Sequence, residues 1–468
     1  MIDAELGRLE VDQFEIREGS EKVFTTRREV FPETGPREAF KSPCLRELFL
    51  LFSIDESFRK GTGKLNRVLL RKERDAIQFR TVANTVEREG ELIEAQRSKE
   101  AEEILESYSF DAEGKRIPSN KGYTSGNEDT SLTEESPSEI REDLGLGKEP
   151  QSAEEKRIPS NEGQGSRRES SCITEELINK AIEEINVGKE KELQIDLSEL
   201  QETFEDPLSV KANISLDDVL SKKQKEGNRK KNAPSKEKKA FVKNTVAHLE
   251  NGENAFYLLN AHCVEKILIL VLAFLLYNGL LNRQGQLIFF IDGAADLRLA
   301  IQSLFLDLLP FKIILDWFHL EKKCKERLSL AMKGKQIRNK VLDHVTPLLW
   351  HGKIDAAISY LEGLNKDNIK NQEEIRLLIG YFERNRSYMP CYALRQKLGL
   401  RVSSNRGEKA NDLVVSSRQK HNGMSWSTSG STSLATVTTL HLNNEQSDWL
   451  LNRKLSFQFR KSEEKAAA

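Results

Sequence analysis

The stretch QLIFFIDGAADLRLAIQSLFLDLLPFKIILDWFHLEKKC, from Gln286 to Cys324, decides the fold that this sequence predicts. Short apolar runs bounded by breakers predict buried strands, and the stretch holds two of them, Leu287–Ile291 and Ile313–Leu315. Between them, apolar residues recur at helical spacing, which predicts an amphipathic helix. A strand, a helix and a strand within about 30 residues form a right-handed βαβ unit with a parallel sheet.

Each of the two predicted strands ends on an aspartate, Asp292 and Asp316. In sheets of this kind, ligands and reacting groups gather at the carboxyl ends of the strands. We therefore expect a polar site at this edge, and we interpret the rest of the chain around it.

Three further strands are predicted before this unit: Val210–Leu220, Phe241–Leu249 and Ala255–Leu259. Asn251-Gly252 marks a hairpin turn between the second and the third. A very apolar helix over 263–281 follows, so the order is β-β-β-α-β-α-β. This is the order of the ribonuclease-H-like fold, and the predicted class is α/β with a mixed sheet, a large all-helical insertion and a helical N-terminal region.

The apolar segment Ile267–Leu281 resembles a membrane span at first sight. It has only 15 residues and includes Asn278 and Gly279, whereas a spanning helix needs roughly 18 or more apolar residues. We expect a helix buried against the sheet and no membrane association.

Composition shifts divide the chain into six parts. The stretch 110–170 is rich in Ser, Glu, Gly and Asn, and such a segment buries too little apolar surface to offset its ordering entropy. It holds the hexapeptide KRIPSN twice, at 115–120 and 156–161. The predicted parts are a helical, candidate DNA-binding region (1–109), a mostly disordered linker (110–205), a first part of the catalytic core (206–316), a helical insertion (317–400), a second part of the core (401–455) and a tail (456–468).

The N-terminal region carries a helical pattern from Leu65 to Tyr108, with a break expected at Gly90. It is basic near its start. Two interpretations stay open: a helix-turn-helix that lays a helix on DNA, or a helical hairpin with a solvated charged face.

Five scattered cysteines, none in a CxxC pair, suit a reducing compartment rather than a disulfide framework. The N-terminus carries no signal-peptide pattern, and we expect a cytoplasmic protein; association with the nucleoid is an expectation that follows only from the family resemblance given below. The formal net charge of -2 does not decide for or against nucleic acid.

Charge is concentrated locally instead. Lys222 to Lys239 holds nine basic residues against Glu226 and Glu237, and a basic loop beside an active site suits a phosphate backbone. A second basic group, Arg418, Lys420 and His421, lies near Trp426 in the sequence. The Trp426 side chain is either a stacking surface for nucleic acid or a core residue. The candidate DNA contacts are Lys222, Lys223, Arg229, Lys230, Lys231, Arg418 and Lys420.

Three carboxylates are expected to converge in such a fold. Asp217 lies on the first, central strand, Asp292 ends the neighbouring parallel strand, and Glu408 lies on a later helix capped by Ser404 or Asn405. Carboxylates are hard oxygen ligands for two Mg²⁺ (or Mn²⁺) ions, which clamp the attacking and leaving oxygens of a phosphoryl transfer. Asp218 remains an alternative to Asp217, because the strand is predicted to end there.

These acids, with Asp316-Trp317-Phe318-His319 between the last two, resemble the DDE transposases of bacterial insertion sequences, in the broad Mutator-like group. The resemblance covers about 205–450 and extends faintly to 60–110. The blocks similar to the ISKra/ISLre-like branch are FFIDGAADLR, ILDWFHLEKKCKERLS, LLWHGKIDAAISYL, ALRQKLGLRVSSNRGEKAND and VVSSRQKHNGMSWSTSGS. The chain departs from the pattern at Asp217–Ser221, where related chains are expected to have a glycine.

The resemblance implies metal-dependent cutting and joining of DNA at the element's ends, with transposon-end and target DNA as partners and a homo-oligomer on the DNA. Asp316 and His319 are either a capping pair or near-site support. Cys324 and His319 could suggest a zinc site, but two ligands do not make one. We therefore expect Cys324 to be a structural thiol. The alternative functions are an inactive, domesticated DNA-binding descendant and a structure-selective nuclease on the same fold.

Overall fold

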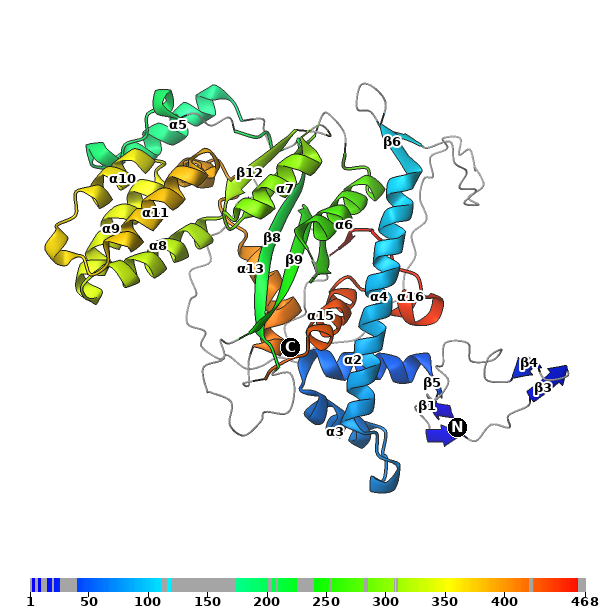
Figure 1. Ribbon diagram of the computed structural model, residues 1–468. Helices are drawn as coiled ribbons and strands as arrows, with labels where there is room; N and C mark the ends of the chain where they lie inside the picture. Colours follow the sequence, from blue (N-terminus) through cyan, green and yellow to red (C-terminus); the bar gives the residue numbers. More distant parts are fainter. Residues whose placement is uncertain are drawn as a thin grey trace, which may run out of the picture.

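The computed structural model describes residues 40–110, 116–118, 173–200, 204–224 and 240–461, with short gaps at 208, 253, 262, 282–284, 307, 309 and 421–423. Before residue 40 it describes only short strands, and Figure 1 shows the whole arrangement. These strands, with the two that follow the N-terminal helices, are β1 (Ile2–Ala4), β2 (Gly7–Leu9), β3 (Glu15–Glu18), β4 (Glu21–Thr25), β5 (Phe40–Lys41), β6 (Tyr108–Phe110) and β7 (Arg116–Pro118).

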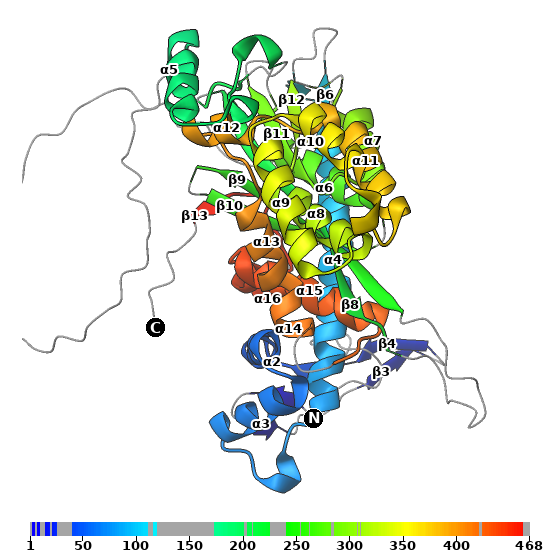
Figure 2. The ribbon, with the colours of Figure 1, turned by 90° about the vertical axis from the view of Figure 1, so that its left-hand side faces the viewer.

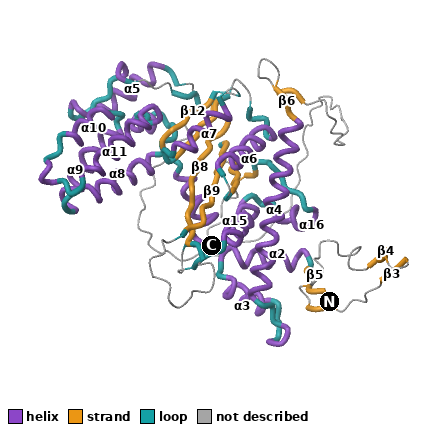
Figure 3. The backbone as a smooth tube through the Cα atoms, viewed as in Figure 1, coloured by secondary structure: helices purple, strands orange, loops and turns teal. Residues whose placement is uncertain are grey.

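A mixed sheet forms the centre of the molecule (Figure 3). Its strands are β8 (Val210–Lys222), β9 (Phe241–Asn251), β10 (Asn254–Asn260), β11 (Gln286–Ile291) and β12 (Phe311–Leu315). The spatial order is β12-β11-β8-β9-β10, and the two-residue β13 (Arg460–Lys461) pairs with the outer edge of β10. β8, β11 and β12 are parallel, whereas β9 and β10 run antiparallel. In chain order this is a 3-2-1-4-5 sheet, and the predicted succession β-β-β-α-β-α-β is confirmed.

Helices cover both faces of this sheet (Figures 1 and 2). α6 (Val264–Tyr277) and α7 (Ala295–Phe305) pack against one face, where alternate strand residues such as Ile214 and Phe289 are fully buried. α6 is buried along most of its length, as expected, because the sheet takes up its apolar surface. Within the described part of the chain, no helix is long and apolar enough to cross a membrane.

The segment predicted as an all-helical insertion is helical. Its helices pack around one core that also takes in Phe290 and Ile314 from the second face of the sheet, so the segment is joined to the sheet rather than separate from it. The helices are α8 (Trp317–Ala331), α9 (Lys335–Trp350), α10 (Ile354–Glu362), η4 (Lys366–Asn368), α11 (Gln372–Asn385), η5 (Arg386–Tyr388) and α12 (Tyr392–Lys397).

The N-terminal helices are α2 (Pro43–Asp55), α3 (Phe58–Val68), η1 (Glu73–Asp75) and α4 (Phe79–Ser107). The break predicted at Gly90 is wrong, because Gly90 lies inside α4, which is continuous over all of its 29 residues. Gly90 instead lets α4 approach α15 (Thr428–Leu442) closely: a Cβ there would lie 2.4 Å from Ser433 Cα. The glycine marks a helix crossing rather than a turn.

Buried ion pairs fasten α4 to the C-terminal part of the chain. Glu89 accepts hydrogen bonds from Trp449 Nε1 and from the guanidinium groups of Arg46 and Arg453. About two turns further along the helix, Arg97 pairs with the fully buried Glu445. Charges this deep are stable only when they are paired, so α4 belongs to the same folded unit as the sheet.

The C-terminal elements are α13 (Asn405–Asn411), the π-helical turn η6 (Asp412–Ser416), α14 (Ser417–Gln419), α15 and α16 (Gln446–Asn452). The Ser/Gly loop predicted over 425–433 is shorter than expected, since Ser427 caps α15, accepting a hydrogen bond from the Gly430 N–H. The last three hydroxyl residues of this stretch, Ser431, Thr432 and Ser433, are buried in helix contacts.

Most of the predicted linker lies outside the described residues, including the second KRIPSN copy and part of the first. Its last part is structured: α5 (Glu175–Asn186), η2 (Lys191–Leu193) and η3 (Leu197–Glu199) pack against the region of α12. In the predicted tail, β13 belongs to the sheet and residues 462–468 lie outside the described residues.

Replacing Gly90 by alanine is expected to lower the free energy of unfolding by about 1–3 kcal/mol, because the new methyl group overpacks the α4–α15 contact. Gly63→Ala is the matched control, since a Cβ at Gly63 in α3 meets nothing within 4 Å. Removing a helical glycine there is expected to raise stability by roughly 0.5–1 kcal/mol. Urea denaturation of both variants measures the difference, and equal effects would contradict the close crossing.

Candidate active site

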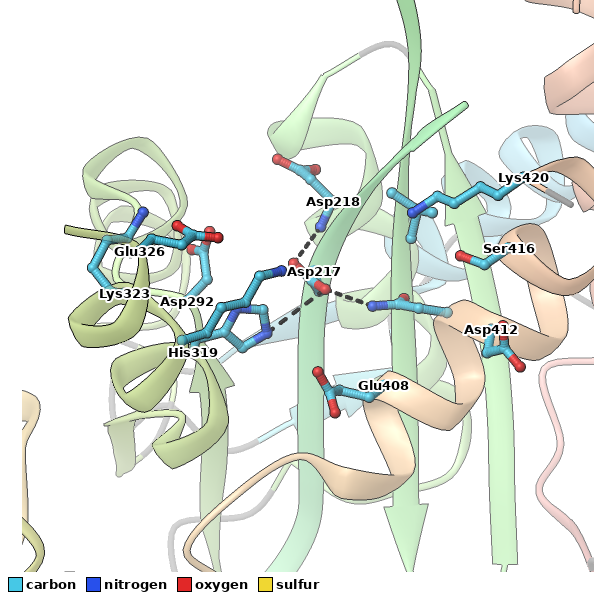
Figure 4. Close-up of a pocket in the computed structure, with 13 residues that line it drawn as sticks. Asp217, Asp218, Asp292, His319, Lys323, Glu326, Glu408, Asp412, Ser416 and Lys420 are labelled. Carbon is cyan, nitrogen blue, oxygen red and sulfur yellow. Dashed lines mark hydrogen bonds and ion pairs between the residues drawn. The ribbon is translucent and has the colours of Figure 1, made fainter. Parts of the chain in front are cut away.

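The first carboxylate, Asp217, lies inside strand β8 rather than at its end. The prediction that the strand stops there is wrong, because β8 pairs with β9 as far as Lys222. Successive side chains of a strand point to opposite faces, so Asp217 and Asp218 separate. Asp218 contacts Lys243 Nζ at 2.6 Å and Thr245 Oγ1 at 2.7 Å, while Asp217 faces the helices (Figure 4).

The register of the parallel strands brings Asp292 beside Asp217. β11 pairs Phe290 with Ser215 of β8, and the two aspartates follow two residues later on each strand. Both side chains therefore lie on the same face of neighbouring strands, which are roughly 4.8 Å apart. The Asp292 carboxylate accepts a hydrogen bond from the Ala294 N–H at 2.9 Å, and Tyr381 of α11 donates to the Asp292 carbonyl at 3.0 Å.

The start of α8 contributes His319 and Asp316, which have different positions. Asp316 is only 1% exposed, and its carboxylate accepts from the Phe318 N–H at 2.8 Å and the Ser404 N–H at 2.5 Å. It caps α8 and anchors the approach to α13. His319, one turn into α8, places Nε2 at 3.7 Å from the Asp217 carboxylate. Asp316 is therefore a helix-capping residue, whereas His319 lies beside the site.

Helix α13 carries Glu408 and Asn411 towards the same point. It lies close to β8 because of Gly407, where a Cβ would come within 2.6 Å of Ser215 Cβ. Asn411 Nδ2 donates to the Asp217 carboxylate at 2.6 Å. The sequence analysis missed Asn411, although its spacing of three residues from Glu408 places both on one helix face.

The π-helical turn that follows α13 is notable because such turns are rare and frequently occur at functional sites. It changes the phase of the helix by one residue over Asp412–Ser416. Asp412, Ser416 and Lys420 all still line the same cavity.

The cavity between β8, α8 and α13 has a volume of about 390 Å³. Figure 4 shows Asp217, His319 and Glu408 lying toward one another from β8, α8 and α13. Besides Val219, the lining of the cavity consists of polar or charged residues: Asp217, Asp218, Asp292, His319, Lys322, Lys323, Glu326, Glu408, Asn411, Asp412, Ser416 and Lys420. Six carboxylates against three lysines make this cavity acidic.

The electrostatics of the cavity favour bound positive charge. Burial raises the pKa of Asp217, with repulsion from Asp292 adding to it and His319 opposing it. Burial also raises the pKa of Glu408, opposed by His319 and reinforced by Asp316 and Asp217. A cation placed between such acids would stabilise their ionised forms.

The donor chemistry of Asp217, Asp292 and Glu408 fits a divalent metal, since all three are hard oxygen ligands. Within the described residues, no three His, Cys, Asp or Glu side chains are placed to hold a metal ion together. Metal binding would therefore require the side chains, of which the longest is Glu408, to move closer together.

Comparisons with protein-family models, with curated proteins and with solved structures found no match for this chain.

The candidate DNA contacts have diverse environments. Lys420 and Lys222 are exposed, Lys223 is half-buried, and Arg229, Lys230 and Lys231 lie outside the described residues. The prediction for Arg418 is wrong: its guanidinium lies buried over the rings of Phe58 and Trp426 and donates to the Ser53 carbonyl at 2.9 Å. Burial lowers the pKa of Arg418 to about 10. Trp426 belongs to the core, being 7% exposed.

Cys324 is buried in α8, and burial raises the pKa of its thiol to about 12. A thiol in such surroundings is inert packing, which agrees with the structural role expected for it.

Replacing Asp217 by asparagine is expected to stabilise the fold at neutral pH. Because the pKa of Asp217 is raised by folding, the folded state binds the proton more tightly than the unfolded state. Ionisation therefore costs stability as the pH rises from the ordinary value of 3.8 through the raised pKa. The thermal midpoint of Asp217→Asn should exceed that of the wild type at pH 7, and the gap should close as the pH falls below 3.8.

Asp218→Asn is the matched control for this experiment. It loses the partly exposed ion pair with Lys243, which is worth about 0–1 kcal/mol, so it should be neutral or slightly destabilising. A lower midpoint for Asp217→Asn than for Asp218→Asn at pH 7 would contradict the electrostatic account of the cavity.

Proposed function

We propose that this chain is a DDE-type transposase, a ribonuclease-H-like enzyme that cleaves DNA strands and transfers them, using two bound Mg²⁺ or Mn²⁺ ions. The observation that carries the proposal is the meeting of Asp217, Asp292 and Glu408 at one acidic cavity. These acids come from the central strand, its parallel neighbour and a helix beyond the helical insertion. The ordered sequence blocks that resemble bacterial insertion-sequence transposases support the same function.

The sheet topology is compatible with this fold. The 3-2-1-4-5 order with an antiparallel first hairpin is that expected of a ribonuclease-H-like core. The first acid lies on the central strand β8, where the mixed sheet changes from antiparallel to parallel pairing. Such a change of direction is where α/β sheets open a crevice for ligands.

Each residue has a role in the proposed reaction. Asp217, Asp292 and Glu408 would hold the ions, which when bound activate a water or a 3′-hydroxyl and stabilise the leaving oxygen. Asn411 and His319 contact the same carboxylate oxygen of Asp217 and so orient it towards the cavity.

The lysines at the cavity serve the substrate. Lys323 on α8 and Lys420 beyond α13 lie on different sides of the cavity (Figure 4), and Lys322 also lines it. These lysines would contact the phosphates of a DNA strand. The partners implied are the DNA of the element's ends and of the target. The proposed state is a homo-oligomer on DNA, because two ends must be paired, in the nucleoid of the cytoplasm.

An inactive DNA-binding descendant is the second candidate. The observation that favours it is that the three acids do not stand as a set ready to hold a metal. A structure-selective nuclease on the same fold is the third, although it gives no role to the helical insertion.

Cleavage of a labelled duplex bearing the element's terminal sequence tests the proposal. Changes to residues around metal ligands typically cost 10–100-fold, so Asp292→Asn and Glu408→Gln are each expected to lower Mg²⁺-dependent nicking by more than about a hundredfold while keeping DNA binding. Asp412→Asn, on the same side of the cavity, is the control that keeps activity. Full activity in the first two variants would refute the site, and binding without cleavage by the wild type would favour the inactive descendant.

Arg418 and Lys420 form a second matched pair for this proposal. Arg418→Gln is expected to lower the free energy of unfolding by roughly 1–3 kcal/mol, because it leaves buried groups unpaired, without weakening DNA binding in proportion. Lys420→Gln should leave the thermal midpoint unchanged and weaken binding at low salt, as measured by fluorescence anisotropy. The reverse pattern would restore the original assignment of Arg418 to DNA.

A further inference from the structure

The end of helix α3 has an unusual backbone. The Arg71 N–H bonds the Asn66 carbonyl at 2.9 Å, and the Leu70 N–H bonds the Arg67 carbonyl at 3.1 Å. This is the Schellman pattern, in which glycine normally occupies the left-handed position. Here that position is Leu70, with φ of 50°. Leucine is disfavoured in this conformation because its Cβ crowds the backbone, and the strain calls for a functional explanation.

The strained leucine projects into solvent. Leu70 is 88% exposed, more than any other large apolar side chain in the described part of the chain, and its neighbour Val68 is 62% exposed. Between them, Leu69 turns inward and packs against the core of the N-terminal helices. We call Val68–Lys72 the apolar tip.

Two hydrogen bonds of Asn66 close the loop that follows the apolar tip. Asn66 bridges the loop that follows it: its Nδ2 donates to the Ile77 carbonyl at 2.9 Å, and its Oδ1 accepts from the Ile77 N–H at 2.8 Å. These bonds close the loop at its base, and ordering a loop before a partner binds lowers the entropic cost of association.

Basic residues outnumber acidic ones around the tip, although Lys64 pairs with Glu56 and Arg74 pairs with Asp75. From residue 59 to residue 80 the sequence holds eight basic residues against two acidic ones. Most of these basic side chains are exposed, including Arg67 and Lys72 on either side of Leu70. The basic residues are Arg59, Lys60, Lys64, Arg67, Arg71, Lys72, Arg74 and Arg80. A surface with this balance is complementary to a polyanion.

We propose that the apolar tip is a wedge that enters the minor groove of duplex DNA and bends it, with Leu70 as the inserted side chain. Minor-groove proteins commonly insert one apolar side chain at a base step while basic residues hold the flanking phosphates. The identity of the polyanion as duplex DNA rests on the proposed function. A membrane surface fits less well, because two projecting side chains lack the continuous apolar face that interfacial helices bury.

The start of α3, the helix that ends in the tip, is linked to the end of β8. Phe58, at the start of α3, stacks on the buried Arg418, which in turn lies over Trp426. The backbone of Trp426 bonds that of Lys222 at the end of β8. Figures 1 and 2 show α3 beyond this end of the sheet. A duplex held at the cavity and bent at the tip would contact both.

Leu70→Gly tests the wedge, because glycine relieves the backbone strain and removes only the side chain. The probe is a mixed-sequence duplex of about 40 base pairs, well below the ~150-base-pair persistence length, with a fluorophore at each end. In EDTA, the wild type should bring the ends closer by energy transfer. Leu70→Gly should lose this change and bind severalfold more weakly, while remaining folded by circular dichroism. Leu70→Asn, which also tolerates the left-handed conformation, should behave alike.

Two controls separate the wedge from charge and from general apolar surface. Leu306→Gly removes a 70% exposed leucine at the end of α7 and should bend DNA as the wild type does. Lys72→Gln should flatten the dependence of log Kd on log salt by about one but keep bending. Normal bending by Leu70→Gly and Leu70→Asn, no binding of duplex by the wild type, or binding to anionic phospholipid vesicles in place of DNA would each overturn the wedge.

The experiment is independent of the proposed catalysis. It uses no metal, and Asp292→Asn should bend DNA as the wild type does. Bending without cleavage would refute only the proposed enzyme, and cleavage without tip-dependent bending would refute only the wedge.

Discussion

Parallel hydrogen bonding between β8 and β11 is the constraint on which the site depends. The register that pairs Phe290 with Ser215 brings Asp292 level with Asp217, and the register of β12 brings Asp316 level with Asp292. A slip of one residue would turn either aspartate to the opposite face. The buried residues that precede the acids oppose such a slip, because their side chains differ in shape and are closely packed against the helices on both faces of the sheet. The packing of the core thus positions its most polar residues.

Around this sheet, helices from distant parts of the chain meet at short contacts between small residues. Gly407 lets α13 lie against β8, and Gly90 lets α4 cross α15. Ion pairs then lock the second of these crossings, with Glu89 and Arg97 of α4 bonded to residues near the C-terminus. The first and last structured parts of the chain consequently depend on each other, although the sequence places them at opposite ends.

The buried acids of the cavity lower the stability of the fold at neutral pH. Asp217 is buried beside other acids, and the burial that raises its pKa also costs stability at neutral pH. The fold tolerates this cost because Asn411, His319 and the Asp218 N–H all contact the Asp217 carboxylate. Strain of a different kind is stored at Leu70, far from the acids along the chain. Both features are of the sort that natural proteins retain at functional positions.

The sequence alone determined the order of the strands, the burial of α6 and the position of Asp292 directly after a buried strand, because apolar runs that end on acids indicate burial and strand ends directly. It could not decide between Asp217 and Asp218, since the pattern of β8 did not show that pairing with β9 carries the strand on to Lys222. It also placed Arg418 on the surface and a break at Gly90, where only the tertiary contacts with Phe58, Trp426 and Ser433 reveal burial. From the sequence, an arginine predicts an exposed charge and a glycine predicts a break in a helix. The residues that pack against them in the fold decide whether either prediction is correct. Asn411 shows the same limit, because its hydrogen bond to Asp217 spans 194 residues.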